Sequence, residues 1–212
     1  MTATATRDRA QTRRTARRLL DEHGTTYAEQ AGIHLRDTPQ PLYQLLVLTV
    51  LSSIRIKAEI AVDAARELSA AGMRSPRAML DASWQDRVDA LGRAHYRRYD
   101  ESTATALGEG ARLLLDRWHG DLRRLRAEAD GDPGRVRELL QEFPRIGPVG
   151  AGIFAREAQG VWPELRPAFD DRALRAAAAH DLPDDPDALA ALVPADDLPR
   201  LAAALTRAAL EH

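Results

Sequence analysis

Apolar residues recur at helical spacing along almost the whole chain of 212 residues. Between Leu42 and Leu51 they occupy nearly every position, which is typical of a helix that is buried on all sides. No stretch alternates between polar and apolar residues as a half-buried strand does, and glycine or proline separates one apolar segment from the next. The pattern therefore predicts a compact all-α fold, and the chain is long enough to bury its own core.

The composition excludes several classes of protein. Cysteine is absent, which excludes disulfides, thiol catalysis, cysteine-zinc sites and iron–sulfur clusters held by cysteine. No apolar run approaches the roughly 18 residues of a membrane span. No apolar segment follows the N-terminal arginines, as it would in a signal peptide. We therefore expect a cytoplasmic protein with no membrane association. Separately, we expect a monomer.

The charge balance restricts any contact with nucleic acid to a local patch. The net charge is −2, and Lys57 is the only lysine among 30 lysine and arginine residues. Near the N-terminus, Arg13, Arg14, Arg17 and Arg18 fit a solvated helix face better than a DNA contact. The six histidines lack the spacing of metal ligands, so no metal site is expected.

The most specific motif is a turn between two expected helices, within residues 140–151. The turn reads Phe143-Pro-Arg-Ile-Gly147, and Gly147 is expected to supply a backbone conformation that is closed to other residues. The N–H groups at the start of the next helix then face outward and form an anion site that suits a DNA phosphate. About 20 residues later, Asp170 and Asp171 stand at the start of another helix.

This combination resembles the helix-hairpin-helix superfamily of DNA glycosylases, which includes endonuclease III, the adenine glycosylase and the alkyladenine glycosylases. Members have a Leu-Pro-Gly-Val-Gly hairpin, followed by a catalytic aspartate at a helix start. Residues 143–147 match the hairpin, 170–176 the aspartate motif and 41–53 the first core helix. The resemblance covers about residues 40–180 and implies a two-lobed all-α fold with DNA in a cleft between the lobes. One lobe would span 41–167, and the other 1–40 plus 168–212.

The resemblance implies excision of a damaged or mispaired base from double-stranded DNA. The base is flipped out of the stack before its glycosidic bond is reached. A carboxylate then stabilises the cationic sugar and activates water. Asp170 is the first candidate for this carboxylate, because the residues after it follow the family pattern best. Asp171 is the alternative, since alkyl-base members also have an Asp-Asp pair. Either residue could instead be only a helix N-cap.

The resemblance also assigns DNA contacts. The hairpin residues expected to bind phosphate are Arg145, Ile146, Gly147, Val149 and Gly150, and a monovalent cation at the hairpin carbonyls is implied. Ile54 stands near the position of the family's intercalating glutamine. Its side chain could insert between stacked bases, or it could only pack against the rest of the protein. Arg55, next to it, could hydrogen-bond an orphaned base.

A basic, aromatic segment at residues 93–99 offers weaker candidates for the base pocket. His95, Tyr96 and Tyr99 lie among arginines there, and this combination suits stacking on a base beside phosphate. The favoured alternative is a loop whose aromatic residues cap the core.

Three departures from the family limit the chemistry. Bifunctional members have a nucleophilic lysine two residues after the last hairpin glycine, where this chain has Val149. Lys57 starts a different helix and is not expected to replace it. The four cysteines that hold the iron–sulfur cluster of endonuclease III are absent, and no cofactor is expected. The sequence therefore predicts a monofunctional DNA glycosylase that uses water. A catalytically inactive, glycosylase-like DNA-binding protein is the main alternative, and an all-α scaffold without DNA contact is a weaker one.

Overall fold

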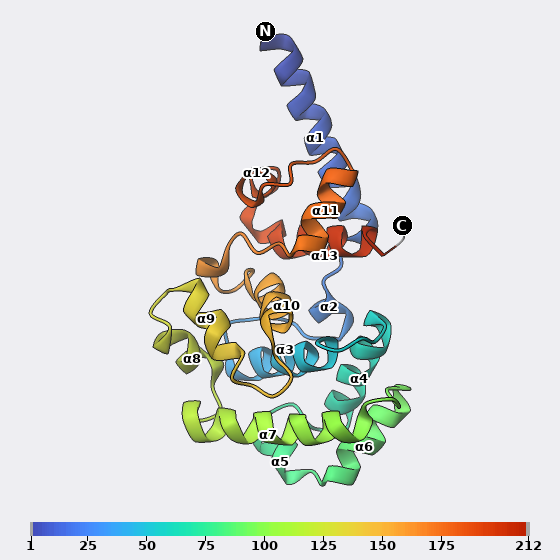
Figure 1. The fold of residues 1–212 in the computed structure, drawn as a ribbon, viewed down its shortest axis with the longest axis vertical. Helices are drawn as coiled ribbons and strands as arrows, with labels where there is room; N and C mark the ends of the chain where they lie inside the picture. Colours follow the sequence, from blue (N-terminus) through green and yellow to red (C-terminus); the bar gives the residue numbers. More distant parts are fainter. Residues whose placement is uncertain (1, 211–212) are drawn as a thin grey trace. The chain divides into compact units, whose positions relative to one another are not determined.

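A computed structural model describes residues 2–210 of the chain. Over this range the chain forms helices and their connections without any strand, which confirms the all-α prediction (Figure 1). None of the described helices has both the length and the apolar character needed to cross a bilayer. The α-helices are α1 (Thr2–His23), α2 (Tyr27–Gln30), α3 (Pro39–Ser52), α4 (Ala58–Ala70), α5 (Pro76–Asp81), α6 (Trp84–Arg93), α7 (Asp100–Trp118), α8 (Leu122–Glu128), α9 (Pro133–Leu140), α10 (Pro148–Ala158), α11 (Asp171–Ala179), α12 (Pro186–Ala190) and α13 (Leu198–Ala208), with 3-10 turns η1 (Pro163–Leu165) and η2 (Ala195–Asp197).

The chain divides into two compact units. A central unit comprises Ala28–Phe154, and a terminal unit joins the N-terminal segment up to Tyr27 to the segment from Ala155 onward. The divisions expected from the sequence lie at 41 and 167 instead. Within the terminal unit, the guanidinium groups of Arg156 and Arg207 lie 5.1 and 4.4 Å from the ring centre of Tyr27. The Gln159 side chain hydrogen-bonds both backbone groups of Ala168. Residues 155–168 are therefore tied to the terminal unit.

The central unit is organised around α3. This helix is buried on nearly all sides, as its sequence predicts, and α4, α7 and α8 pack against it. Pro39 and Pro41 both lie in its first turn, where proline replaces backbone N–H groups that would have no helical acceptor. The helix ends at Ser52, and Ser53 follows as its C-cap, with a hydroxyl that donates to the Thr49 carbonyl oxygen at 2.7 Å.

Capping residues set most helix boundaries. The Ser75 hydroxyl accepts from the Ala78 N–H at the start of α5, and Ser83 and Asp86 form a capping box on α6. Helix α8 was not predicted from the sequence, although Asp121 directly after Gly120 caps it by accepting from the Arg123 N–H. The arginines expected on a helix face, from Arg13 to Arg18, lie in α1, which begins at Thr2.

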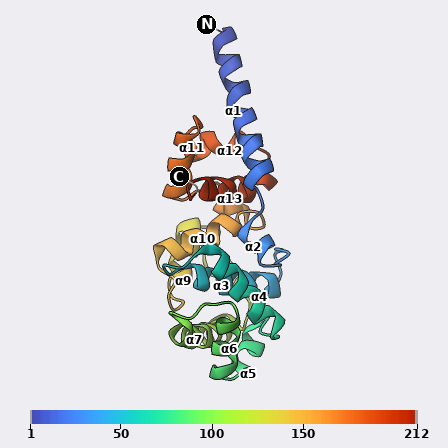
Figure 2. The ribbon, with the colours of Figure 1, turned by 90° about the vertical axis from the view of Figure 1, so that its right-hand side faces the viewer.

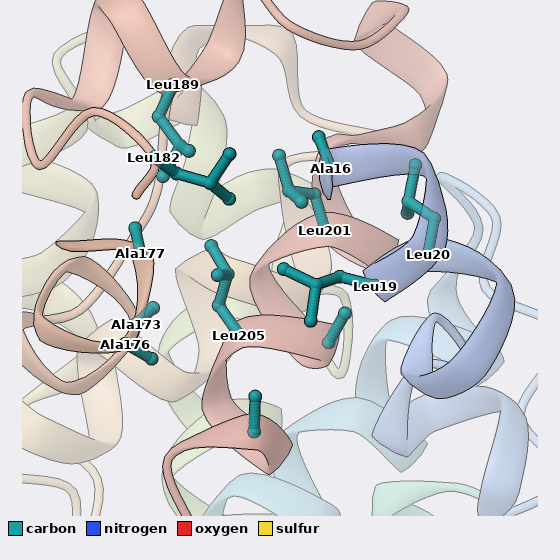
Figure 3. Close-up of a cluster of buried hydrophobic side chains, with 12 residues drawn as sticks. Ala16, Leu19, Leu20, Ala173, Ala176, Ala177, Leu182, Leu189, Leu201 and Leu205 are labelled. Atoms are coloured by element: carbon teal, nitrogen blue, oxygen red, sulfur yellow. The ribbon is translucent and has the colours of Figure 1, made fainter. Parts of the chain in front are cut away.

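The terminal unit has a separate alanine- and leucine-rich core. Helices α1 and α11 both pack against α13 (Figure 2). Leu19 and Leu20 of α1 meet Leu201 and Leu205 of α13, with the alanines of α11 beside them (Figure 3). Burial of these apolar side chains holds the two ends of the chain in one unit.

Candidate functional site

The hairpin in the central unit is held by its apolar residues. Phe143 and Ile146 are 2% and 3% exposed, and the Ile146 N–H donates to the Phe143 carbonyl oxygen at 3.1 Å. The Phe143 ring stacks on Trp118 of α7, with 5.6 Å between ring centres. The turn from α9 into α10 is therefore fixed from inside the core, while its other face is left on the surface.

The left-handed residue of this turn is Arg145, not Gly147. Arg145 has φ 68°, whereas Gly147 is not among the positive-φ glycines, so the conformational role expected of Gly147 is wrong. A Cβ atom on Gly147 would meet nothing within 4 Å. A non-glycine residue in the left-handed region costs roughly 1 kcal/mol. The hairpin of the glycosylases that the sequence resembles has glycine at the position of Arg145, where this chain bears that cost.

The start of α10 presents free backbone donors. The N–H groups of Gly147 and Val149, two exposed residues, have no acceptor among the described residues, and the Ala151 N–H bonds back to the Gly147 carbonyl oxygen at 2.9 Å. Pro148 contributes no donor. Free N–H groups at the positive end of a helix form a binding geometry for an anion.

Three segments of the central unit meet at this hairpin. A Cβ atom on Gly150 would lie 2.5 Å from the Ser53 Oγ, so α10 approaches the end of α3 as closely as glycine allows. The Tyr96 hydroxyl donates to the Leu51 carbonyl oxygen at 2.9 Å. Burial raises the pKa of Tyr96 to about 12, and the nearby positive charge of Arg145 acts in the opposite direction. Residues 51–57, 93–99 and 143–150 are therefore neighbours.

These three segments form what we call the hairpin surface, which is positively charged. It carries six cations and no carboxylate. Arg93 is paired with Glu67 at 2.7 Å. The other five have no ion pair within the described part of the chain: Arg55, Lys57, Arg97 and Arg98, which are exposed, and Arg145, which is half-buried. In a chain of net charge −2, this is a local patch suited to a polyanion.

The residues expected to contact DNA differ in how they are placed on this surface. Val149 is 76% exposed, Arg55 is exposed, and Ile54 is half-buried. The side chain of Ile146 and the whole of Gly150 are buried, so these two residues hold the hairpin in place rather than offering a side chain to a ligand.

The aromatic segment separates into core and surface residues. Tyr96 is fully buried and bonded to Leu51. It is therefore a core residue, and its assignment to a base pocket is corrected. His95 is exposed, with φ 59°. Tyr99 is half-buried, with the Arg98 guanidinium 5.3 Å from its ring centre. His95 and Tyr99 thus remain accessible next to the hairpin.

We expect Gly150→Ala to lower the free energy of unfolding by about 1–2 kcal/mol, because the new methyl group overlaps the Ser53 hydroxyl. Urea denaturation measures this. Gly152→Ala in the same helix is the matched control, since a Cβ atom there meets nothing within 4 Å. Ser53→Ala should remove most of the cost in the double variant. An equal cost with and without Ser53→Ala would contradict the close approach of α10 to α3.

The terminal unit holds the candidate carboxylate. Asp170 is the N-cap of α11, and its Oδ1 accepts from the Ala173 N–H at 2.8 Å. Its Oδ2 accepts from Nη1 of Arg156 at 3.1 Å, and the Asp170 side chain is 33% exposed. Asp171 begins the helix and is exposed. Asp170 is thus held in a fixed orientation with part of its carboxylate open to solvent.

Arg156, the partner of Asp170, was not predicted from the sequence. Its side chain is 6% exposed, and its Nη1 also donates to the Thr206 Oγ1 at 3.3 Å. Its Nε lies 3.6 Å from Oε1 of Glu157, which is itself 1% exposed. The one sign of Arg156 in the sequence is that Arg156 and Glu157 are the only charged residues of α10, whose other residues are apolar or small. Among the described residues, no three His, Asp or Glu side chains are grouped as metal ligands would be.

Comparisons with known proteins give a likeness of fold. No protein-family model matches the chain, and no curated protein matches its sequence. A solved structure described as a trapped covalent intermediate of endonuclease III with DNA, an estranged-adenine complex, is similar to it with a TM-score of 0.51 and 17% sequence identity. The match covers 92% of this chain and 84% of that one. The chain therefore has an endonuclease III-like all-α fold.

Proposed function

We propose that this protein is a monofunctional DNA glycosylase that removes a damaged or mispaired base from double-stranded DNA. The observation that carries the proposal is the hairpin surface, where free N–H groups of α10 lie beside five cations that have no counter-ion among the described residues. Phosphate contacts of this kind position a protein on DNA without reading its sequence. The similar endonuclease III structure contains DNA.

Asp170 supplies the chemistry in this proposal. When the C1′–N bond of a flipped base breaks, positive charge develops on the sugar. A fixed, partly exposed carboxylate stabilises that charge. Water then forms the new C1′–O bond, and its proton leaves with the departing base. Because its Oδ1 and Oδ2 are held by Ala173 and Arg156, the carboxylate needs little reorganisation.

The proposed reaction proceeds through water because the chain lacks a suitable amine. Val149 occupies the position of the family's nucleophilic lysine, and Lys57 is exposed before α4, as the N-cap of that helix. A Schiff base between enzyme and sugar is therefore not part of the proposal, and neither is an iron–sulfur cluster, since the chain has no cysteine.

Base release from a panel of lesion-containing duplexes tests this function. We expect the protein to leave abasic sites in one of the duplexes, which hot alkali converts to strand breaks, and to cut no strand without alkali. Cutting without alkali would contradict the monofunctional assignment. Binding of duplex DNA without release from any duplex would favour the second candidate, an inactive DNA-binding protein. One observation already favours that candidate, because the cap and the ion pair give Asp170 a structural role.

Arg145→Gly should weaken the salt dependence of DNA binding without lowering the stability of the fold. Glycine relieves the left-handed strain, so the free energy of unfolding should stay equal or rise by up to about 1 kcal/mol. Loss of one phosphate contact should lower the slope of log affinity for duplex DNA against log salt by about 0.9. Fluorescence anisotropy over a salt series measures the slope. Arg66→Gln removes a charge that is already paired with Asp63 and should leave the slope unchanged. An unchanged slope in Arg145→Gly would remove Arg145 from the DNA contact.

A further inference from the structure

Helix α1 has a basic face opposite its buried face. Its arginines 13, 14, 17 and 18 are all exposed, and at 3.6 residues per turn they lie within an arc of about 140°. The buried residues Ala16, Leu19 and Leu20 lie on the other side of the helix. We call these four arginines the α1 arginine face. The sequence alone favoured a solvated surface for them, but it did not show what surrounds them.

The α1 arginine face lacks counter-ions, unlike many other arginines of the protein. Arginines elsewhere pair with carboxylates, as in Arg66–Asp63, Arg123–Asp121 and Arg135–Glu138. Within the described residues, none of the four α1 arginines forms an ion pair. Asp21 and Glu22 follow within a helical turn of Arg17 and Arg18 and remain unpaired with them. The face therefore keeps its charge available for an external anion.

The charge is concentrated on one element of the terminal unit. From Ala155 onward, Asp and Glu outnumber Arg, whereas α1 has more arginines than carboxylates. The sign of the surface thus changes between α1 and the rest of its unit. A localised positive potential of this kind attracts polyanions even when the net charge is slightly negative.

The apolar side of α1 is already occupied. Ala16, Leu19 and Leu20 are packed in the core formed with α11 and α13 (Figure 3). A helix that binds at a membrane surface needs an exposed apolar face to insert between lipids. The described part of α1 has no such face to spare, so a polyanion with regularly spaced charges is the better-matched partner.

We infer that the α1 arginine face is a second contact for the phosphate backbone of duplex DNA, independent of the hairpin surface. The inference rests on the proposed function, because that function supplies the duplex. Arginine suits this role through its fork of N–H donors, which matches phosphate oxygens. The contact adds affinity without sequence preference, since backbone contacts do not read bases.

The test is the salt dependence of binding to an undamaged duplex. In the test variant, Arg13, Arg14, Arg17 and Arg18 are all changed to Gln, which preserves helix propensity. We expect the slope of log affinity against log salt to fall by about 2–4, since each lost phosphate contact removes about 0.9. The control changes Arg66, Arg117, Arg123 and Arg135 to Gln. It removes the same charge from residues that already face carboxylates. Circular dichroism checks that α1 stays helical in the test variant.

Each outcome separates the two proposals. A test variant with the slope of the control overturns the α1 contact, while a lowered slope in Arg145→Gly would leave the hairpin surface in place. A wild-type protein that shows no salt-dependent binding of duplex DNA overturns both. An equal fall in the test variant and the control would show that total charge, rather than the α1 arginine face, governs binding, and would also overturn the inference.

Discussion

Asp170→Asn is expected to reduce the rate of base release by about 10³-fold. The asparagine side chain keeps the shape of aspartate but has no negative charge to stabilise a cationic sugar, and a preorganised electrostatic contact of this kind typically contributes 10²–10³ or more to the rate. Single-turnover kinetics on the duplex from which the wild-type protein releases a base would measure the loss. Binding of the same duplex should change little, because Asp170 belongs neither to the hairpin surface nor to the α1 arginine face, to which we assign the phosphate contacts.

The same substitution should keep the N-cap of α11, although it removes the ion pair between Asp170 and Arg156. Asparagine caps a helix about as well as aspartate does, so the bond to the Ala173 N–H can be kept. Asp171→Asn is the matched control, because Asp171 is the neighbouring carboxylate and is exposed. If Asp171→Asn abolishes release and Asp170→Asn does not, the catalytic role moves to Asp171. If an active wild-type protein is unaffected by either change, the proposed mechanism is wrong.

Arg156→Met is expected to lower the free energy of unfolding by about 3 kcal/mol. Methionine has a similar length but no charge, so the substitution leaves Glu157 buried beside an apolar side chain and Asp170 without its partner. Breaking a buried ion pair typically costs 3–5 kcal/mol, and the partial exposure of Asp170 favours the lower end of that range. Thermal or urea denaturation would measure the change.

A double-mutant cycle attributes this loss to the ion pair. Arg156→Met and Asp170→Asn should couple, with the double variant less destabilised than the sum of the single variants, because each removes the same contact. Arg175→Met on α11 is the control, since that arginine is exposed and should cost little. Additive effects of the two changes would show that Arg156 stabilises the unit through Glu157 and Thr206 rather than through Asp170.

The helical fold could be predicted because its signals are local. The apolar positions of α3, the capping box at Ser83 and the Asp170 cap all depend on residues within one or two turns. The hairpin and the spaced aspartate also stand in the sequence itself, so the candidate site was found before any geometry was known. The short helix α8 was missed because only one capping residue, Asp121, signals its start.

Features that depend on distant residues could not be predicted in this way. Arg156 looks like any charged residue of a helix until folding places it beside Asp170 and Thr206. Tyr96 and Tyr99 share one basic segment, and only the bond from Tyr96 to Leu51 separates the core residue from the accessible one. Position 150 requires glycine because a Cβ atom there would overlap the hydroxyl of Ser53, which lies almost one hundred residues earlier in the chain.

The cationic side chains of the hairpin surface are, apart from Lys57, all guanidinium groups. Guanidinium keeps its charge across the physiological pH range and is not a target of lysine acetylation. Cellular enzymes that acylate lysine could therefore neutralise at most one charge on this surface. Its affinity for a polyanion would follow the ionic strength of its surroundings and would be nearly insensitive to acyl-group metabolism.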